Sequence, residues 1–252
     1  MPFLDRKVAI VTGAGTGIGR GVSIALGREG AHVMVSGRKQ ELLDETAAMV
    51  RDVGGTALTA ICDVTDTHQL DALVETTVRE FGTIDILVNN AQSPMANVPL
   101  LDWPDENFAE GFEAVALATF RLMKACHPYL RGGGVIVNFG TGAGIRPDPI
   151  GYGCYAAIKE AVRTLSRTAA VEWGPDGIRV HTVVPLASSD ALRAWAEHRP
   201  EESRKFFDTV PLGRLGDPEA DIGRAIAFLC GPDSAYITGN TIAIDGGQAY
   251  LH

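Results

Sequence analysis

Two tyrosines precede a single lysine in the stretch GYGCYAAIK, residues 151–159. Residues four positions apart share one face of a helix, so Tyr155 and Lys159 stack about one turn apart if this segment is helical. A phenol with a pKa near 10 transfers protons poorly at neutral pH, but an adjacent ammonium favours the phenolate. The spacing therefore predicts proton-transfer chemistry at Tyr155, assisted by Lys159. Tyr152 lies about two turns before the lysine on a similar face if the helix extends that far, which suits a substrate-pocket residue.

A second cluster of chemically useful residues is the glycine-rich stretch TGAGTGIG, residues 12–19. It joins an apolar run to a segment with helical periodicity, GIGRGVSIALGREG. Glycines allow a tight turn and the close approach of a ligand, and the N-terminal amides and dipole of a helix suit a pyrophosphate. This context predicts a dinucleotide-binding loop, with a tight turn that binds no ligand as the alternative. The candidate contacts are Gly13, Gly15, Thr16, Gly17, Ile18 and Gly19.

The end of the next apolar run, VMVSGRK, carries Arg38 directly after Gly37. At this place an acidic residue would accept hydrogen bonds from the adenosine 2′-hydroxyl of NAD, whereas a glycine and an arginine leave room and a cation for a 2′-phosphate. The pattern therefore favours NADP(H) as the cofactor, with NAD(H) as the alternative. A solvated surface arginine is the other interpretation of Arg38.

Short β-branched runs alternate with helical segments along the chain. The runs are VAIVT, HVMVS, ALTAI, IDILVN, GVIVNF, IRVHTVV and TIAID. Strands that are apolar throughout are typical of parallel sheets covered by helices on both faces. We therefore expect an α/β fold, a Rossmann-type doubly wound parallel sheet, in a single NAD(P)-binding domain spanning residues 1–252.

A charged insertion, residues 186–210, interrupts this alternation. It separates the run IRVHTVV from the helical segment DPEADIGRAIAFLC. Long insertions after a strand are commonly lids or binding loops, and a solvated connector is the alternative. We expect a substrate lid over about residues 186–210.

Composition narrows the kinds of partner. The net charge of -9 argues against nucleic acids and anionic membranes, which bind surfaces rich in Lys and Arg, so small molecules are the expected ligands. The four cysteines lie in apolar segments without a CxxC pair, which predicts reduced, buried thiols and a cytoplasmic protein. No segment has the length of apolar sequence that a membrane span needs. The six histidines show no spacing typical of a metal site, so we expect chemistry without a metal.

Taken in order, the motifs resemble those of the short-chain dehydrogenase/reductase family over nearly the full length. They are TGxxxGIG, CDV, NNA, YAAIK, IRV, PLGRLGDPE and SAYITGNTIAIDGG. The resemblance implies an oxidoreductase in which Tyr155 exchanges a proton with a carbonyl or alcohol oxygen while nicotinamide carries the hydride. Lys159 would also hold the nicotinamide ribose. The further cofactor contacts that the resemblance implies are Asp63 at the adenine amino group, Val64, Asn90, Ala91 and Pro185.

A threonine stands in place of the family's catalytic serine. The stretch VIVNFGTGAG has Gly140 and Thr141 where the family usually has a serine pair. A threonine hydroxyl can donate a hydrogen bond to the substrate oxygen as serine does, and its added methyl restricts the rotamer. We therefore expect Thr141 to be the third catalytic residue, and a strand-end threonine bonded to the backbone is the alternative.

Other departures from the family lie near the expected nicotinamide site. Val115 stands where the family usually has an asparagine that supports a water relay to the lysine, and Thr119, one turn later, is a candidate replacement. Glycines are replaced by Gln92 and Leu186, and a threonine is replaced by Asp190. These changes leave two alternatives to a reductase open. One is a nucleotide-binding protein with weakened or lost catalysis that acts as a sensor or structural partner, and the other is an epimerase-type reaction at the same site.

Substrate contacts are expected after the carboxyl ends of the strands, where open α/β sheets bind ligands. The candidates are Gln92, Met95, Ile145, Tyr152 and Trp195, with Phe206 as a further apolar residue and Arg146 for an anionic group. They suggest a small to mid-sized, partly apolar carbonyl or alcohol. The family resemblance further implies a homodimer or homotetramer built through the helices carrying residues 104–130 and 152–173 and the C-terminal strand.

Overall fold

Seven parallel strands form the central sheet of the protein. The computed structural model describes residues 2–92, 98–146, 151–188, 192 and 196–249. The strand order is β3-β2-β1-β4-β5-β6-β7. The strands are β1 (Val8–Thr12), β2 (His32–Gly37), β3 (Thr56–Ile61), β4 (Ile86–Asn89), β5 (Val135–Phe139), β6 (Arg179–Pro185) and β7 (Thr241–Ile244). Each strand overlaps one of the predicted apolar runs, and the sheet confirms the predicted Rossmann-type α/β fold.

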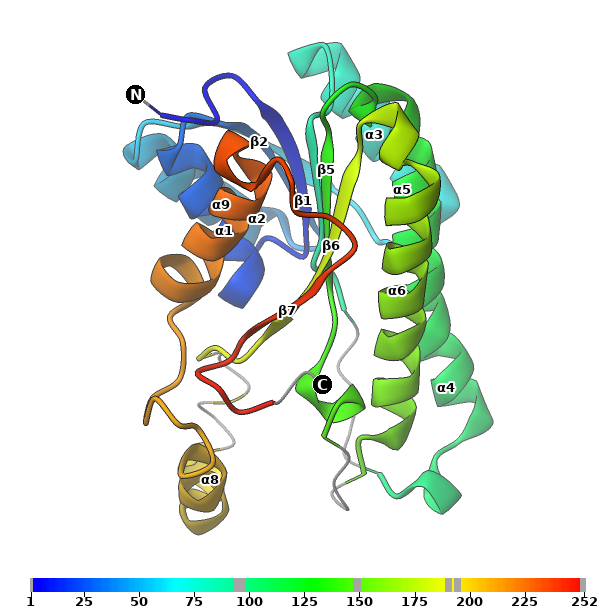
Figure 1. Ribbon diagram of the computed structural model, residues 1–252, viewed down its shortest axis with the longest axis vertical. Coiled ribbons are helices and arrows are strands. Elements are labelled where there is room, and N and C mark those ends of the chain that lie inside the picture. The colour runs from blue at the N-terminus through cyan, green and yellow to red at the C-terminus, as the bar shows by residue number, and fades with distance from the viewer. Residues whose placement is uncertain (1, 93–97, 147–150, 189–191, 193–195, 250–252) are drawn as a thin grey trace.

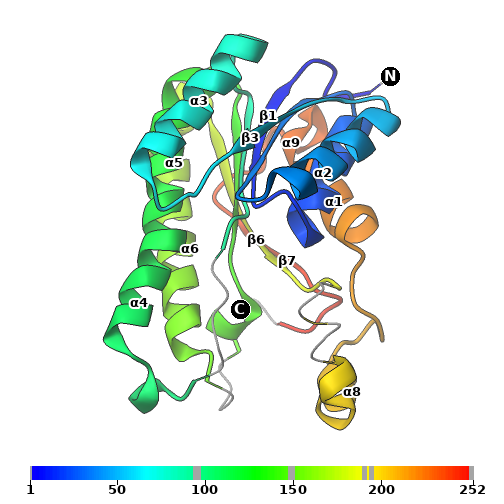
Figure 2. The same ribbon diagram turned by 180° about the vertical axis from the view of Figure 1, so that it is seen from behind.

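Helices cover both faces of the sheet (Figure 1). One face carries α1 (Gly17–Arg28), α2 (Gln40–Asp52) and α9 (Arg224–Cys230). The opposite face carries α3 (Thr67–Phe81), α4 (Asp105–Phe112), α5 (Ala118–Leu130) and α6 (Gly153–Glu172), and the view from behind in Figure 2 shows the same two layers of helices. Side chains alternate along β1, so Ala9 and Val11 pack into the core on the first face and Ile10 packs into the core on the second. Burial on both faces explains why the strands are apolar throughout.

Local side-chain bonds set the boundaries of α3. The carboxylate of Asp66 accepts hydrogen bonds from the amides of His68 and Gln69 at the first turn, as an N-cap residue does. The helix ends at Gly82, which has a left-handed φ of 87°. The amide of Asp66 also donates to the carbonyl of Asp63, so the cap holds the turn that follows β3.

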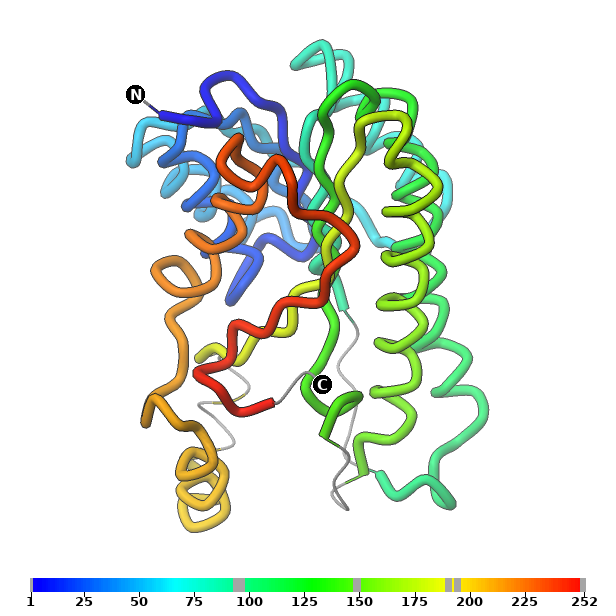
Figure 3. Tube along the Cα trace, in the orientation of Figure 1, coloured from blue at the N-terminus to red at the C-terminus, as the bar shows by residue number. Residues whose placement is uncertain are grey.

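The predicted insertion contains a helix at the end of the sheet where the strands finish. This helix, α8 (Pro200–Phe207), lies below the carboxyl ends of the strands in Figure 1. Figure 3 follows the chain from α8 along one side of the sheet to α9. At the start of the insertion, Ala187 pairs with Gly216 in an isolated bridge. The position of α8 is suitable for a lid, but part of the insertion, residues 189–191 and 193–195, lies outside the described residues.

All four cysteines are free and buried, which confirms the prediction of reduced, buried thiols. Burial raises the pKa of the Cys62 thiol to about 11 and that of Cys230 to about 12, so both are neutral at physiological pH. Among the helices in the described residues, none has the length and apolar character needed to cross a membrane.

Candidate functional site

The glycine-rich loop between β1 and α1 forms a cradle that excludes side chains. Gly13 has φ +62°, and a Cβ there would lie 2.9 Å from the Cα of Ala91. A Cβ on Gly19 would lie 2.4 Å from the carbonyl oxygen of Gly13. In contrast, a Cβ on Gly17 would point into open space, although its φ of +54° also favours glycine. The loop is therefore close-packed on its inner side and open on the side that faces solvent.

The open side of the loop presents the start of α1. The cap residue Thr16 makes no side-chain cap bond, and no acidic residue lies in the first turn of α1, all of which is described. The first amides of the helix therefore have no side-chain acceptor, and the positive end of the helix dipole is not neutralised. The cradle and these amides fit the pyrophosphate of a dinucleotide.

Arg20 and Thr46 hold this loop in place, a role that the sequence analysis missed. The Arg20 guanidinium donates to the Gly15 carbonyl at 2.6 Å and to Thr46 Oγ1 at 3.0 Å, and it pairs with Glu45 at 2.8 Å. Thr46 Oγ1 in turn donates to the Ala14 carbonyl at 3.0 Å. No local signal reveals these contacts, because α2 brings Glu45 and Thr46 to the loop from a distant part of the sequence.

Arg38 and Asp63 lie near each other at the carboxyl ends of β2 and β3. Hydrogen bonds from the amide and hydroxyl of Thr65 lower the pKa of Asp63, and the charge of Arg38 lowers it further. Arg38 is exposed, and within the described part of the chain its guanidinium makes no hydrogen bond or ion pair. This cation is therefore available to an anionic group near the end of β2.

The turn after β4 is tied to the end of β1. Thr12 Oγ1 accepts hydrogen bonds from the amides of Asn90 at 3.1 Å and Ala91 at 3.0 Å. The Asn90 side chain donates to the carbonyls of Thr12 at 2.9 Å and Gly13 at 3.0 Å. Asn90 therefore connects β4 to the glycine cradle and places Ala91 against it.

A small cavity of about 10 Å³ lies beside this turn, which is room for about one water molecule. Its walls include Val64, Ala91 and Thr119, and the polar residues Thr12 and Asn89. Neither Tyr155 nor Lys159 lines it. Thr119 therefore faces the turn after β4, and the suggested relay from Thr119 to Lys159 stays a prediction.

Tyr155 and Lys159 stack on the first two turns of α6, as predicted. The Lys159 Nζ lies 5.8 Å from the centre of the Tyr155 ring and donates to the carbonyl of Phe139, at the end of β5, at 3.1 Å. Lys159 is only 2% exposed, and burial lowers its pKa to about 8. Tyr152 precedes the helix, and its ring centre lies 6.2 Å from that of Tyr155.

The structure contradicts the expectation that the pKa of Tyr155 is lowered. We expected the ammonium of Lys159 to lower it, but burial raises the pKa of Tyr155 to about 12 and Tyr152 adds to the rise. A hydrogen bond with Thr141 acts in the opposite direction. The reason is geometric, because the Nζ of Lys159 is bonded to the Phe139 carbonyl and lies over the face of the phenol ring.

Thr141 begins the turn after β5, where its hydroxyl bonds the backbone, as in the alternative considered for it. Its Oγ1 accepts a hydrogen bond from the Ala143 amide at 3.3 Å, which leaves the hydroxyl proton free to be donated. The same hydroxyl lies close enough to the Tyr155 phenol to lower the pKa of that phenol. The preceding position is tightly packed, because a Cβ on Gly140 would lie 3.0 Å from Thr182 Cγ2 and that methyl group would have to shift by a few tenths of an ångström.

Val115 lies in a π-helical turn, Glu113–Leu117, that joins α4 to α5. It is 2% exposed and packs in one apolar cluster with Ala116, Ile158 and Val162. Ile158 directly precedes Lys159 on α6. The side chain at position 115 therefore has apolar neighbours and offers no hydrogen-bonding group.

A buried polar chain behind the site was also missed by the sequence analysis. Asn138 on β5 accepts from Asn89 Nδ2 at 2.8 Å, and its own Nδ2 donates to Ser166 Oγ at 2.8 Å. These bonds connect β4, β5 and α6, and Asn138 directly precedes the residue whose carbonyl binds Lys159. The available signal is an asparagine within the apolar run VIVNF, because a buried amide needs partners.

The structure describes only some of the predicted substrate contacts. The carboxamide of Gln92 accepts a hydrogen bond from the Tyr155 hydroxyl at 3.4 Å. Ile145 and Tyr152 are partly exposed at the same end of the sheet. Phe206 packs against Phe207 on α8. Met95 and Trp195, and the departure at Asp190, lie outside the described residues, whereas Arg146 is described and exposed.

Pro185 and Leu186 lie where β6 meets β7. Pro185 is the register partner of Ile244, and the Leu186 amide donates to the Ile244 carbonyl at 3.0 Å. The replacement of the family's glycine by Leu186 is thus accommodated with the backbone bonded to β7.

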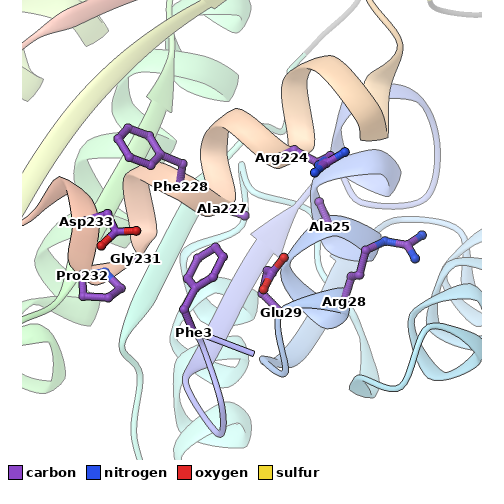
Figure 4. Close-up of a pocket in the computed structure, with 10 residues that line it drawn as sticks. All are labelled: Phe3, Ala25, Arg28, Glu29, Arg224, Ala227, Phe228, Gly231, Pro232 and Asp233. Carbon is purple, nitrogen blue, oxygen red and sulfur yellow. The ribbon is translucent and has the colours of Figure 1, made fainter. Parts of the chain in front are cut away.

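A larger groove, of about 210 Å³, lies away from these residues between the N-terminal segment, α1 and α9 (Figure 4). The rings of Phe3 and Phe228 line it, with Arg28, Glu29 and Asp233 among its charged residues. None of the predicted site residues lines this groove. In the described part of the chain, no group of three or more His, Cys, Asp or Glu residues is arranged to hold a metal ion.

Known proteins resemble this chain over almost its full length. A family model described as enoyl-(acyl carrier protein) reductase matches residues 13–249. The 12α-hydroxysteroid dehydrogenase of Clostridium sp. (strain ATCC 29733 / VPI C48-50) is 41% identical over 98% of both chains. The 7α-hydroxysteroid dehydrogenase of Escherichia coli (strain K12) is 34% identical over 97% of this chain and 94% of its own.

Solved structures have the same architecture. One is 7α-hydroxysteroid dehydrogenase complexed with NADH and 7-oxo glycochenodeoxycholic acid, with a TM-score of 0.91 and 33% identity over 98% of this chain and 96% of that chain. Levodione reductase has a TM-score of 0.90 and 30% identity over 97% of this chain and 98% of that chain. The chain therefore belongs to the short-chain dehydrogenase/reductase family and is an NAD(P)-dependent oxidoreductase.

Proposed function

We propose that the protein is an NADP(H)-preferring oxidoreductase of a small to mid-sized, partly apolar carbonyl or alcohol, with Tyr155 as the general acid and base. The observation that carries the proposal is the contact between the Tyr155 hydroxyl, Gln92 and Thr141 beside the buried Lys159. These groups lie at the carboxyl ends of β4 and β5, next to the glycine cradle, where open α/β sheets bind ligands. A substrate oxygen would reach both hydroxyls at this place.

The nucleotide would bind across the carboxyl ends of the strands. The residues proposed to hold it are Gly13, Gly15, Thr16, Gly17, Ile18, Gly19, Asp63, Val64, Asn90, Ala91, Lys159 and Pro185. Arg38 is proposed to bind the 2′-phosphate of NADP(H), and its exposed guanidinium, which has no partner among the described residues, supports this preference. When bound, the nicotinamide supplies or accepts the hydride.

Three side chains would control the transfer of a proton to the substrate oxygen. With a pKa of about 12, the Tyr155 phenol is protonated at neutral pH and can donate to a carbonyl oxygen. Thr141 would donate a second hydrogen bond to that oxygen. Lys159, with a pKa of about 8, is mostly charged at neutral pH and would stabilise the phenolate once it forms.

Hydroxysteroids are the first substrates to test. Two relatives are named as 12α- and 7α-hydroxysteroid dehydrogenases, and they match nearly the whole chain. Ile145 and Tyr152 offer partly apolar surface near Tyr155, which suits an alicyclic ring system. We propose that α8 and the rest of residues 186–210 form a lid over such a substrate, within one domain spanning residues 1–252.

We also propose a cytoplasmic homodimer or homotetramer. Exposed apolar side chains on α4, α5 and α6 support an interface there, and they are Phe108, Phe112, Phe120, Tyr129 and Val171. Free, buried cysteines are consistent with a reducing compartment. Light scattering after size-exclusion chromatography measures the oligomeric state, and a monomer at micromolar concentration would contradict this proposal.

One experiment tests the proposed function. Purified protein is titrated with NADPH and NADH by fluorescence, and ketones that include oxosteroids are then added while absorbance of the reduced nicotinamide is followed. We expect tighter binding of NADPH, stoichiometric oxidation of the cofactor, and loss of turnover in Tyr155→Phe but not in the control Tyr236→Phe, at an exposed tyrosine outside the proposed site. Binding without net oxidation would favour the epimerase or sensor alternatives, and full activity of Tyr155→Phe would remove the assigned acid.

A further inference from the structure

Gln92 occupies a position where the family usually has a glycine, so its side chain is an addition to the site. The two residues before it are fixed, because the amides of Asn90 and Ala91 both donate to Thr12 Oγ1. The Asn90 side chain adds two bonds to the backbone of β1 and the glycine cradle. The start of the Gln92 side chain is therefore placed by a rigid turn.

This side chain reaches the proposed acid. The Tyr155 hydroxyl donates to Gln92 Oε1 at 3.4 Å, a long hydrogen bond, and the two residues belong to different segments, because Gln92 follows β4 and Tyr155 lies on α6, after β5. Among the described residues, the polar or titratable groups that face the phenol are few. They are Gln92 after β4, Thr141 after β5, and Tyr152 and Lys159 near the start of α6.

Two of these groups are poorly placed to donate a hydrogen bond to a phenolate. The Nζ of Lys159 bonds the Phe139 carbonyl and lies over the ring face, 5.8 Å from its centre. The ring centre of Tyr152 lies 6.2 Å from that of Tyr155, and within the described part of the chain no hydrogen bond joins the two hydroxyls. Val115, which replaces the family's asparagine, packs in an apolar cluster and offers no donor. Thr141 and Gln92 are then the donors that remain among the described residues.

A carboxamide can serve both forms of the phenol. It has an acceptor oxygen and an NH₂ donor on the same carbon, so a half-turn about its last bond exchanges them. The oxygen accepts from the neutral phenol, and the NH₂ group donates to the phenolate. The second bond is charge-assisted and is therefore the stronger of the two.

We propose that Gln92 is a further catalytic residue, whose carboxamide accepts a hydrogen bond from the neutral Tyr155 phenol and donates one to the phenolate formed during carbonyl reduction. In that step the O–H bond of Tyr155 breaks, the O–H bond of the product alcohol forms, and the carbonyl carbon receives the hydride of the reduced nicotinamide. The phenolate then takes a proton from water. This inference rests on the proposed function, because it assigns Gln92 a role only if Tyr155 is the acid.

Two substitutions of similar size separate the possible roles of Gln92. Gln92→Leu removes both hydrogen-bonding groups, whereas Gln92→Glu keeps an acceptor of the same length and loses the donor at neutral pH. We expect both to lower kcat by about tenfold to a hundredfold, the usual effect of one charge-assisted hydrogen bond. Gln92→Asn, which keeps the amide on a shorter chain, should recover part of kcat. NADPH binding, followed by fluorescence, should change less than kcat in all three.

A second readout does not depend on turnover. A fluorinated tyrosine at position 155 ionises at lower pH than tyrosine, which brings its titration into a range where proteins stay folded, and ¹⁹F NMR follows it in the nucleotide-free protein. We expect Gln92→Leu to raise the midpoint of this titration by about one pH unit or more, and Gln92→Glu to raise it further. A residue with a purely structural role would leave the midpoint unchanged.

The outcomes separate this inference from the proposed function. If Tyr155→Phe is inactive while Gln92→Glu keeps the kcat and the titration midpoint of the unsubstituted protein, Gln92 does not donate to the phenolate and the inference fails alone. If Tyr155→Phe keeps full turnover, the proposed function fails and the role of Gln92 fails with it. Loss of kcat together with a raised midpoint in both Gln92→Leu and Gln92→Glu would support the inference.

Discussion

The nucleotide end and the proton-transfer end of the site are built in different ways. At the nucleotide end, backbone atoms leave no space for a Cβ at Gly13 and Gly19, and Arg20 ties the loop to α2. At the proton-transfer end, side chains provide the shape, and a buried lysine has no carboxylate among its described partners. The departures from the family, such as Thr141 and Gln92, lie at this second end.

The difference shows why the two ends tolerate substitution differently. A cradle made of backbone depends on the absence of side chains, so most substitutions on its inner side produce a steric clash. A site made of hydroxyl and amide groups depends on hydrogen-bonding capacity, which several residue types can supply. Threonine can therefore replace serine after β5, and a carboxamide can be added after β4, while the glycine pattern is retained.

The largest effect is expected at the proton-transfer end. Tyr155→Phe removes the proposed acid without changing the shape of the ring, and we expect turnover to fall by about 10²- to 10⁴-fold. Binding of NADPH should change little, because the glycine cradle is untouched. Steady-state kinetics measures turnover, and fluorescence titration measures NADPH binding. If Tyr155→Phe lowers both to a similar degree, the proton-transfer end and the nucleotide end do not act independently.

The next largest effect is expected at the nucleotide end. Gly19→Ala places a Cβ 2.4 Å from the Gly13 carbonyl oxygen, and we expect the free energy of unfolding to fall by about 3 kcal/mol, with loss of nucleotide binding. Gly174→Ala is the matched control, because its Cβ would have no atom within 4 Å. Denaturant unfolding measures both variants. Equal stability of the two would contradict the steric account of the cradle.

A smaller and opposite effect is expected for Lys159→Met. Burial lowers the pKa of Lys159 to about 8 from 10.5, so the native state disfavours the ammonium. Between these two values the unfolded chain holds a proton that the native chain has released, and stability therefore rises with pH across this window. Below pH 8 the native protein bears the full cost of burying the charge. We expect Lys159→Met to be about 2 kcal/mol more stable than the unsubstituted protein at pH 7.

Unfolding of Lys159→Met at pH 7 and pH 10 tests this account. The stability difference from the unsubstituted protein should shrink as pH rises, because deprotonation removes the cost of the buried charge. Lys124→Met, at an exposed lysine of α5, should show no such dependence. If Lys159→Met is less stable than the unsubstituted protein at pH 7, the lysine stabilises the fold. That result would contradict our account that the buried ammonium lowers stability.

The smallest effect is expected for Arg38→Ala. Loss of one charge-assisted contact to a 2′-phosphate should weaken NADPH binding by about tenfold and leave NADH binding nearly unchanged. Lys39→Ala, at the neighbouring exposed cation, is the control. Fluorescence titration with both nucleotides measures the ratio. If Arg38→Ala weakens the binding of NADPH and of NADH equally, Arg38 does not select the cofactor.

Much of the architecture could be predicted from local patterns. Each apolar run became a strand because burial on both faces of a parallel sheet requires apolar residues throughout, and this requirement is visible in a single segment. The stacking of Tyr155 and Lys159 was predicted because it depends only on helical spacing. The direction of the Tyr155 pKa shift was predicted wrongly, because burial and the direction of the Lys159 Nζ depend on packing with β5.

The sequence alone therefore determined where the strands and helices lie, the position of the glycine loop and the pairing of Tyr155 with Lys159. These features depend on residues that are close together in the chain. Tertiary structure alone decided the contact of Lys159 with Phe139, 20 positions away, and of Tyr155 with Gln92, 63 positions away. The same holds for Arg20 and Thr46, 26 positions apart. These contacts form only when the parallel strands bring their carboxyl ends together, which no local pattern of residues encodes.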